Sequence, residues 1–165
     1  QWGADSMFEI PSARVGVYLA SYLAAVVKFS DVGAFAVGIT WGRHKMFPRI
    51  SPKKSWEGFF GGIAAAMLVS VAMIQAAKHY TWLPGGPLTA LNVPHALILG
   101  AVLGVVGAMG DLIESMFKRS ANTKDSAGLL PGGGGGILDM FDSLTFTPAV
   151  LYFYLAWFVG QSISP

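Results

Sequence analysis

Three uncharged apolar stretches, each long enough to cross a lipid bilayer, constrain the fold of this 165-residue chain more than any other feature. They cover residues 58–77, 91–110 and 143–161. Because a helix rises about 1.5 Å per residue, about twenty residues cross a hydrocarbon core of roughly 30 Å. The second stretch carries Pro94 and His95 near its start, and the third ends in aromatic side chains. Each stretch is therefore predicted to form a transmembrane helix.

A fourth apolar stretch, residues 15–42, is interrupted by Lys28 and Asp31. The pattern fits either one long helix that carries both charges or a broken pair of helices. A charge within a membrane helix is costly and usually faces protein or water, so Asp31 is a candidate functional residue. Its alternative role is a partner for Lys28, which precedes it by three residues on the same helix face.

The composition excludes several classes of protein. Hydrophobic residues make up 53% of the chain and charged residues only 12%, which is about half the average of roughly 25% for soluble proteins. The chain is therefore neither a soluble globule nor disordered. Without cysteine it has no disulfide, thiolate metal site or cysteine nucleophile. No basic run with interleaved aromatic residues points to a nucleic-acid partner. The predicted fold class is an all-α polytopic membrane protein with about four transmembrane helices.

The distribution of basic residues predicts the orientation of these helices. Residues 43–55 hold five of the eleven lysines and arginines, whereas residues 78–89 hold only Lys78. Residues 111–142 hold three more basic side chains. Because cytoplasmic loops carry the excess of Lys and Arg, the first and third of these polar segments are predicted to be cytoplasmic and the second external.

The segment after the third apolar stretch combines acidic and basic side chains. Read as a continuing helix, its start has a polar face and an apolar face, although a plain solvated helix end would show the same pattern. The polar face holds Asp111, Glu114, Ser115 and Lys118, and the apolar face holds Leu112, Ile113, Met116 and Phe117.

Five consecutive glycines, residues 132–136, precede Asp139 and Asp142. Glycine lets backbone N–H groups approach an anion closely, and carboxylates are the hard ligands that Mg²⁺ prefers. No Gly-Lys-Ser/Thr closes the run, so it is not a Walker loop. The segment favours either a site for Mg²⁺ and a polyphosphate or a simple glycine linker.

A second polar cluster precedes the first uncharged stretch. Ser51 is predicted to cap a helix with Pro52 at its first position, which puts Lys53 and Lys54 in the first turn, ahead of Glu57. Cations at a helix N-terminus oppose the dipole, so an anion is expected nearby, either a lipid phosphate or a substrate phosphate. The three histidines show no ligand spacing and are predicted to be structural.

Three segments in this order resemble the phosphatidate cytidylyltransferases, also called CDP-diacylglycerol synthases. They are SDVGAFAVGITWGRHKMFPRISPKKSWEGFFGG, GAMGDLIESMFKR, and SMFKRSANTKDSAGLLPG followed by the glycine run and ILDMFDSL. The likeness runs over about residues 29–144. Two details depart from the family. Five glycines follow Pro131 where Pro-Gly-His-Gly-Gly is common, and Met140 occupies the position of a common Arg.

The resemblance implies transfer of the cytidylyl group of CTP to phosphatidate, which gives CDP-diacylglycerol and pyrophosphate in phospholipid biosynthesis. The departures leave the acidic residues intact. The resemblance implies that Asp111 and Asp139 bind a divalent cation, Mg²⁺, with Asp142 in support. Lys124 would contact the CTP phosphates, and Asp125 would orient Lys124 or the ribose.

The remaining site residues implied by the resemblance bind the two substrates. Lys118 and Arg119 would contact the phosphates of CTP. Lys53 and Lys54 would attract the lipid phosphate, and Ser115 and Asp31 would add polar groups to the lining of the cavity. Besides cytidylyl transfer, three alternatives stay open: a CTP-dependent lipid-alcohol kinase, a membrane transporter or scaffold, and an inactive relative of the family.

The resemblance also predicts the organisation of the chain. Residues 1–165 are expected to form a single membrane-embedded catalytic domain, the C-terminal part of a longer chain. It would lie in the bacterial cytoplasmic (inner) membrane, with both polar segments and the active site facing the cytoplasm. The expected partners are phosphatidate and CTP, and the sequence is also compatible with a homodimer.

Overall fold

The computed structural model describes residues 13–47, 51–80, 83–120 and 146–158. Most of these residues are helical, which confirms the predicted all-α class. The elements in chain order are α1 (Ala13–Trp41), β1 (Lys45–Phe47), β2 (Ser51–Ser55), α2 (Trp56–His79), the 3₁₀ helix η2 (Gly86–Ala90) and α3 (Val93–Ser120). A further helix, Phe146–Phe158, follows α3 in the sequence.

Within the described residues, three helices have the length and apolar character needed to cross a membrane. They are Ala13–Trp41, Trp56–His79 and Val93–Ile113. α1 is unbroken, so residues 15–42 follow the first of the two alternatives, a single helix. The fourth predicted crossing is described only as Phe146–Phe158, which is shorter than a membrane span; its other predicted residues lie outside the described ranges.

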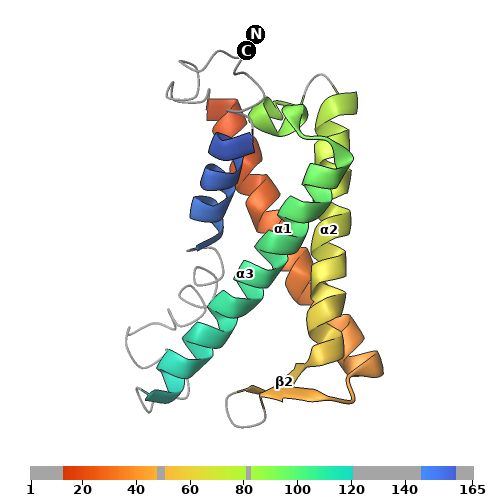
Figure 1. The fold of residues 1–165 in the computed structure, drawn as a ribbon, viewed down its shortest axis with the longest axis vertical. Helices are drawn as coiled ribbons and strands as arrows, with labels where there is room; N and C mark the ends of the chain where they lie inside the picture. The colour runs from red at the N-terminus through yellow and green to blue at the C-terminus, as the bar shows by residue number, and fades with distance from the viewer. Residues whose placement is uncertain (1–12, 48–50, 81–82, 121–145, 159–165) are drawn as a thin grey trace, which may run out of the picture.

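The three long helices pack closely because glycines lie where they meet. α1 and α3 cross in Figure 1, and α2 packs against both. A Cβ atom on Gly62 of α2 would lie 2.9 Å from the Ser30 carbonyl oxygen of α1. One on Gly100 of α3 would lie 2.8 Å from the Met67 Cα of α2. Small residues at such crossings let helix backbones approach, which is how helices associate where the hydrophobic effect is absent.

A chain of buried hydroxyl groups also joins the three helices. The Ser70 Oγ donates a hydrogen bond to the Ala96 carbonyl oxygen at 2.6 Å. Since serine has one hydroxyl proton, the Tyr22 hydroxyl must be the donor in its 2.7 Å contact with the Ser70 Oγ. Both side chains are fully buried, at 0% exposure. The bilayer core holds no water to replace these partners, so these hydrogen bonds link α1, α2 and the first turn of α3.

We expect the Ser70→Ala substitution to lower the free energy of unfolding by about 1–2 kcal/mol, because it leaves the buried Tyr22 hydroxyl without this acceptor. Tyr22→Phe should cost less, since Ser70 keeps its bond to the Ala96 carbonyl. Unfolding in mixed micelles titrated with a denaturing detergent measures both values. Tyr152→Phe, at a residue 58% exposed, is the matched control. Equal losses in all three variants would contradict the assigned hydrogen bonds.

The sequence did not predict the antiparallel hairpin of β1 and β2. The expected helix start at Ser51 is wrong, because Ser51–Ser55 is a strand paired with β1. Pairing with β1 holds the backbone of residues 51–55 in an extended conformation. Pro52 is tolerated there because each strand of a two-stranded sheet is an edge strand. The helix cap is instead Ser55, whose Oγ accepts a hydrogen bond from the Gly58 N–H at 3.2 Å. The charged residue in the first turn of α2 is therefore the acidic Glu57, which suits the helix dipole. The adjacent Lys53 and Lys54 precede the helix, in β2.

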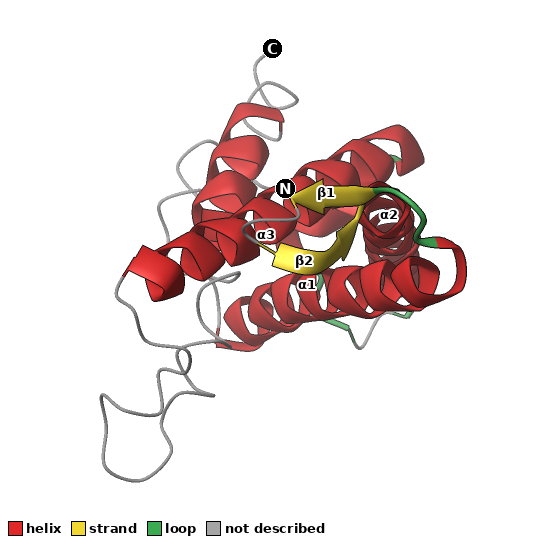
Figure 2. Cartoon of the chain, turned by 90° about the horizontal axis from the view of Figure 1, so that it is seen from below, coloured by secondary structure: helices red, strands yellow, loops and turns green. Residues whose placement is uncertain are grey.

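The hairpin and the C-terminal part of α3 lie at the same end of the helices, and η2 lies at the opposite end (Figure 1). Seen from the hairpin end, β1 and β2 lie near the start of α2, between α1 and α3 (Figure 2). The two polar segments predicted to share one side of the membrane thus meet at one end of the fold. The 43–55 segment and the start of the 111–142 segment touch there through Lys54 and Asp111.

Candidate functional site

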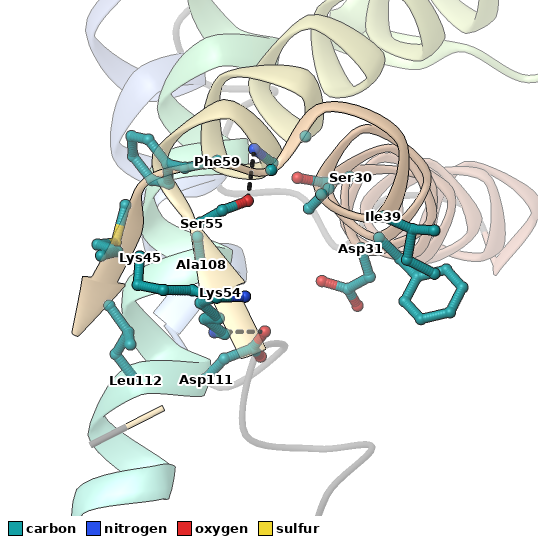
Figure 3. A pocket seen from close by; sticks show the side chains of 17 residues that line it. Ser30, Asp31, Ile39, Lys45, Lys54, Ser55, Phe59, Ala108, Asp111 and Leu112 are labelled. Atoms are coloured by element: carbon teal, nitrogen blue, oxygen red, sulfur yellow. Dashed lines mark hydrogen bonds and ion pairs between the residues drawn. The ribbon is translucent and has the colours of Figure 1, made fainter. Parts of the chain in front are cut away.

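A cavity of about 670 Å³ lies at the hairpin end, between α1, the hairpin, the start of α2 and α3. Its wall is largely apolar, with a few polar groups that converge on one space (Figure 3). The polar lining residues are Ser30, Asp31, Lys45, Lys54, Ser55 and Asp111. An apolar hollow with a few convergent charges is the usual form of a ligand site.

An ion pair crosses this cavity wall between β2 and α3. The Lys54 Nζ lies 3.3 Å from the Asp111 Oδ2, although the two residues are 57 positions apart. The side chains are 33% and 28% exposed, so the pair is only partly screened by solvent. The structure therefore brings together two of the residues that the sequence assigned to different polar clusters.

Asp31 faces the same cavity from α1 (Figure 3). Its Oδ2 also lies 3.9 Å from the Lys28 Nζ, one helical turn earlier. Both roles expected of Asp31 are thus present, the lining of a polar cavity and the pairing with Lys28. A carboxylate in a mainly apolar helix is accommodated here because it points into a cavity that Lys45 and Lys54 also line.

Lys45 is a cavity residue that sequence reasoning missed. Its side chain extends from β1 toward Lys54 and Asp111 (Figure 3). Among the described residues, no carboxylate oxygen lies within ion-pair distance of its ammonium. In the sequence Lys45 was only one of five basic residues that set the orientation, and no local signal separated it from the others.

The other predicted site residues are placed less completely. Lys53 belongs to β2, and Ser115, Lys118 and Arg119 belong to the last turns of α3, which continues through Asp111 as predicted. Lys124, Asp125, Asp139 and Asp142 lie outside the described residues. Leu112 also lines the cavity, although it was assigned to the apolar helix face and Asp111 to the polar one. A wide cavity contacts helix neighbours that are about 100° apart.

A second polar contact ties the hairpin to α2 beside the cavity. The Glu57 carboxylate accepts hydrogen bonds from the His44 backbone N–H at 3.2 Å to each oxygen. Its Oε1 also lies 2.7 Å from the His44 Nδ1. The Trp56 N–H donates to the His44 carbonyl at 3.0 Å. Sequence reasoning predicted a structural histidine without finding its partner, because the contact depends on the unpredicted hairpin.

The donor groups of the cavity suit a hard divalent cation. Asp111 and Asp31 offer carboxylate oxygens, which favour Mg²⁺ over softer metals. Within the ranges that the structure describes, no three His, Cys, Asp or Glu side chains gather as a complete ligand group. A fuller ligand set therefore requires further oxygen donors, such as water, a substrate phosphate, or the carboxylates that follow the glycine run.

Comparison with known proteins gives consistent matches. The chain matches the cytidylyltransferase family over residues 1–158, which extends the likeness to the residues before position 29, where no motif was recognised. It is 39% identical over 147 residues to the phosphatidate cytidylyltransferase of Bacillus subtilis, covering 88% of this chain and 50% of that protein. It is 39% identical over 140 residues to the enzyme of that name from Haemophilus influenzae, covering 84% and 46%.

An Escherichia coli K12 protein called uncharacterized protein YnbB is 36% identical over 150 residues, covering 90% of this chain and 46% of that protein. The chain spans about half the length of the curated relatives it matches.

Proposed function

Because this chain belongs to the cytidylyltransferase family, we propose that it transfers the cytidylyl group of CTP to phosphatidate, forming CDP-diacylglycerol and pyrophosphate. The observation that carries this proposal is the Lys54–Asp111 pair in a cavity at the end of membrane-length helices. Both substrates are phosphate anions and one is a lipid. The site therefore needs basic side chains that attract the phosphates and carboxylates that hold a metal cation. It must also lie at a membrane surface.

The reaction brings two anions together. An oxygen of the lipid phosphate attacks the α-phosphorus of CTP, and the bond from that phosphorus to the β-phosphate oxygen breaks, releasing pyrophosphate. Charge repulsion between the reactants is the main obstacle, so fixed positive groups accelerate the step. Lys45 and Lys54 face the cavity and would hold the lipid phosphate, with Lys53 beside them in β2.

The CTP phosphates are assigned to the basic residues at the end of α3 and just after it in the sequence. Lys118 and Arg119 lie about two turns beyond Asp111, in the part of α3 at the hairpin end of the fold. Lys124 would extend this set, with Asp125 orienting Lys124 or the ribose. Ser115 would add a polar group to the cavity wall.

Asp111 and Asp139 would hold Mg²⁺, with Asp142 in support. When bound there, the cation supplies charge stabilisation to the triphosphate. Asp111 is suited to this role because its carboxylate is part-buried in the cavity wall. It also lies beside the Lys54 ammonium, which is proposed to bind the lipid phosphate.

The cavity wall also suits a lipid. Phe35 and Ile39 of α1 line the cavity and are 70% and 68% exposed. Apolar side chains beside lysines match an amphiphile whose headgroup is charged and whose tails are not. The excess of basic residues at this end supports a cytoplasmic orientation, and the bacterial relatives support the inner membrane.

The position of a radioactive phosphate in CTP separates this function from the alternatives. Membranes carrying the protein are incubated with phosphatidate and CTP labelled at either the α- or the γ-phosphate. We expect the α-label in the lipid and the γ-label in pyrophosphate. A γ-label in a lipid product would instead indicate a lipid kinase. No consumption of CTP would favour a transporter, a scaffold or an inactive relative.

A further inference from the structure

We propose that Glu57 is a positioning residue: by binding His44 from outside the cavity, it holds the β1–β2 hairpin so that Lys45 and Lys54 face Asp111. The contact itself depends only on the fold. The substrate that the two lysines bind rests on the proposed function.

The contact secures residue 44 from three sides. The Glu57 carboxylate binds its backbone N–H and its ring, and the Trp56 N–H binds its carbonyl oxygen. Residue 44 is the last residue before β1, and Glu57 is the second residue of α2. The contact therefore joins the entry of the hairpin to the helix that follows its exit.

Neither partner lines the cavity, but their neighbours do. Lys45 follows His44, and Ser55 and Gly58 stand close to Glu57 in the sequence; all three are lining residues. The His44 side chain is 80% exposed and that of Glu57 is 27% exposed. Glu57 thus acts on the cavity through the backbone that carries Lys45 and Lys54, not by touching what the cavity holds.

The hairpin needs such an anchor. β1 has three residues and β2 has five, and their register is irregular between Lys45 and Phe47. A two-stranded hairpin is only marginally stable by itself. Lysine side chains are flexible, so the strand backbone decides where their ammonium groups can reach. A carboxylate that accepts from both donors of residue 44 fixes the base of the hairpin.

Kinetics of graded variants test the proposal. Glu57→Ala is expected to raise KM for phosphatidate about tenfold with a smaller change in kcat, because ground-state binding by the lysines is what is lost. Glu57→Gln keeps one acceptor oxygen and should recover part of this loss. His44→Ala keeps the backbone N–H and should also lose less. His79→Ala, the same residue type at the far end of α2, is the control and should leave KM unchanged.

A double substitution separates positioning from a direct role. In a Lys54→Met background, Glu57→Ala should raise KM for phosphatidate by less than about threefold, since part of what it positions is already missing. An undiminished effect of Glu57→Ala in that background would overturn the proposal. So would a parental KM in both Glu57→Ala and Glu57→Gln.

A distance measurement tests the contact without the reaction. The chain has no cysteine, so Met46→Cys and Met109→Cys place spin labels only on β1 and α3. We expect Glu57→Ala to broaden the distance distribution between the labels, and His79→Ala to leave it as in the parent. An unchanged distribution in Glu57→Ala overturns the proposal. Broadening in Glu57→Ala, together with a parent protein that forms no CDP-lipid, would support the positioning role and contradict the proposed function instead.

Discussion

The Asp111→Asn substitution is expected to lower kcat for CDP-diacylglycerol formation about a hundredfold or more. It removes a carboxylate that lies 3.3 Å from the Lys54 ammonium and that is assigned to the cation. Loss of a ligand to a catalytic cation removes several kcal/mol of transition-state stabilisation, and each 1.36 kcal/mol corresponds to about tenfold in rate. The measurement is the rate of CDP-lipid formation at saturating CTP and phosphatidate in reconstituted membranes.

Two variants make the Asp111 result interpretable. Asp111→Glu keeps the charge and should recover part of the activity. Met116→Leu, at a residue 53% exposed further along the same helix, should behave as the parent. Turnover of Asp111→Asn within about twofold of the parent, in protein that unfolds at the parental temperature, would exclude Asp111 from the chemistry.

The Gly58→Leu substitution is expected to destabilise the protein by about 3 kcal/mol and to abolish activity. A Cβ atom at this position would lie 2.7 Å from the Ala34 carbonyl oxygen and 3.2 Å from the Gly38 Cα, both of which belong to the backbone of α1. Backbone atoms cannot rotate away as side chains do, so α1 and α2 must separate. Gly58 also lines the cavity, so the larger side chain would enter it.

Gly16→Leu is the matched control for this steric prediction. Gly16 lies on α1, and a Cβ atom there meets nothing within 4 Å. Both variants add the same side chain to a membrane-length helix. Thermal unfolding of the purified proteins in detergent should show a large loss for Gly58→Leu and almost none for Gly16→Leu. Similar unfolding temperatures in the two variants would show that α1 and α2 do not meet closely at Gly58.

The long helices could be predicted because their signal is local. Residues 58–77 carry no charge over enough length to cross a bilayer, and they lie within α2. Asp111 stood out as a carboxylate directly after another such stretch, on a helix that continues through it. Composition and length suffice for these inferences, because a membrane allows few alternatives to a helix.

The hairpin could not be predicted because its signal is not local. β2 contains Pro52 and adjacent lysines, without the alternation of apolar and polar residues that marks a strand. The same residues are equally typical of the start of a helix, which led to the wrong prediction of a helix cap at Ser51. Pairing with β1 and the Ser55 cap decide the structure, and both become visible only in three dimensions.

The shared cavity of Asp31 and Asp111 was also beyond local reasoning. The two residues lie on α1 and α3, and their approach depends on how these helices cross. Their charges made each a candidate separately, but no sequence feature paired them. Lys45 was overlooked for the same reason, because its direction is set by the hairpin register.

The shared cation site is the central claim, and replacing its two proposed ligands by cysteine tests it most directly. The chain has no cysteine of its own, and thiolates favour Cd²⁺ over Mg²⁺. Equilibrium binding of Cd²⁺ is compared for the purified Asp111→Cys, Asp139→Cys and doubly substituted proteins. If both positions hold one ion, the double variant should bind Cd²⁺ at least about tenfold more tightly than either single variant. Equal affinity in all three proteins would contradict a shared cation.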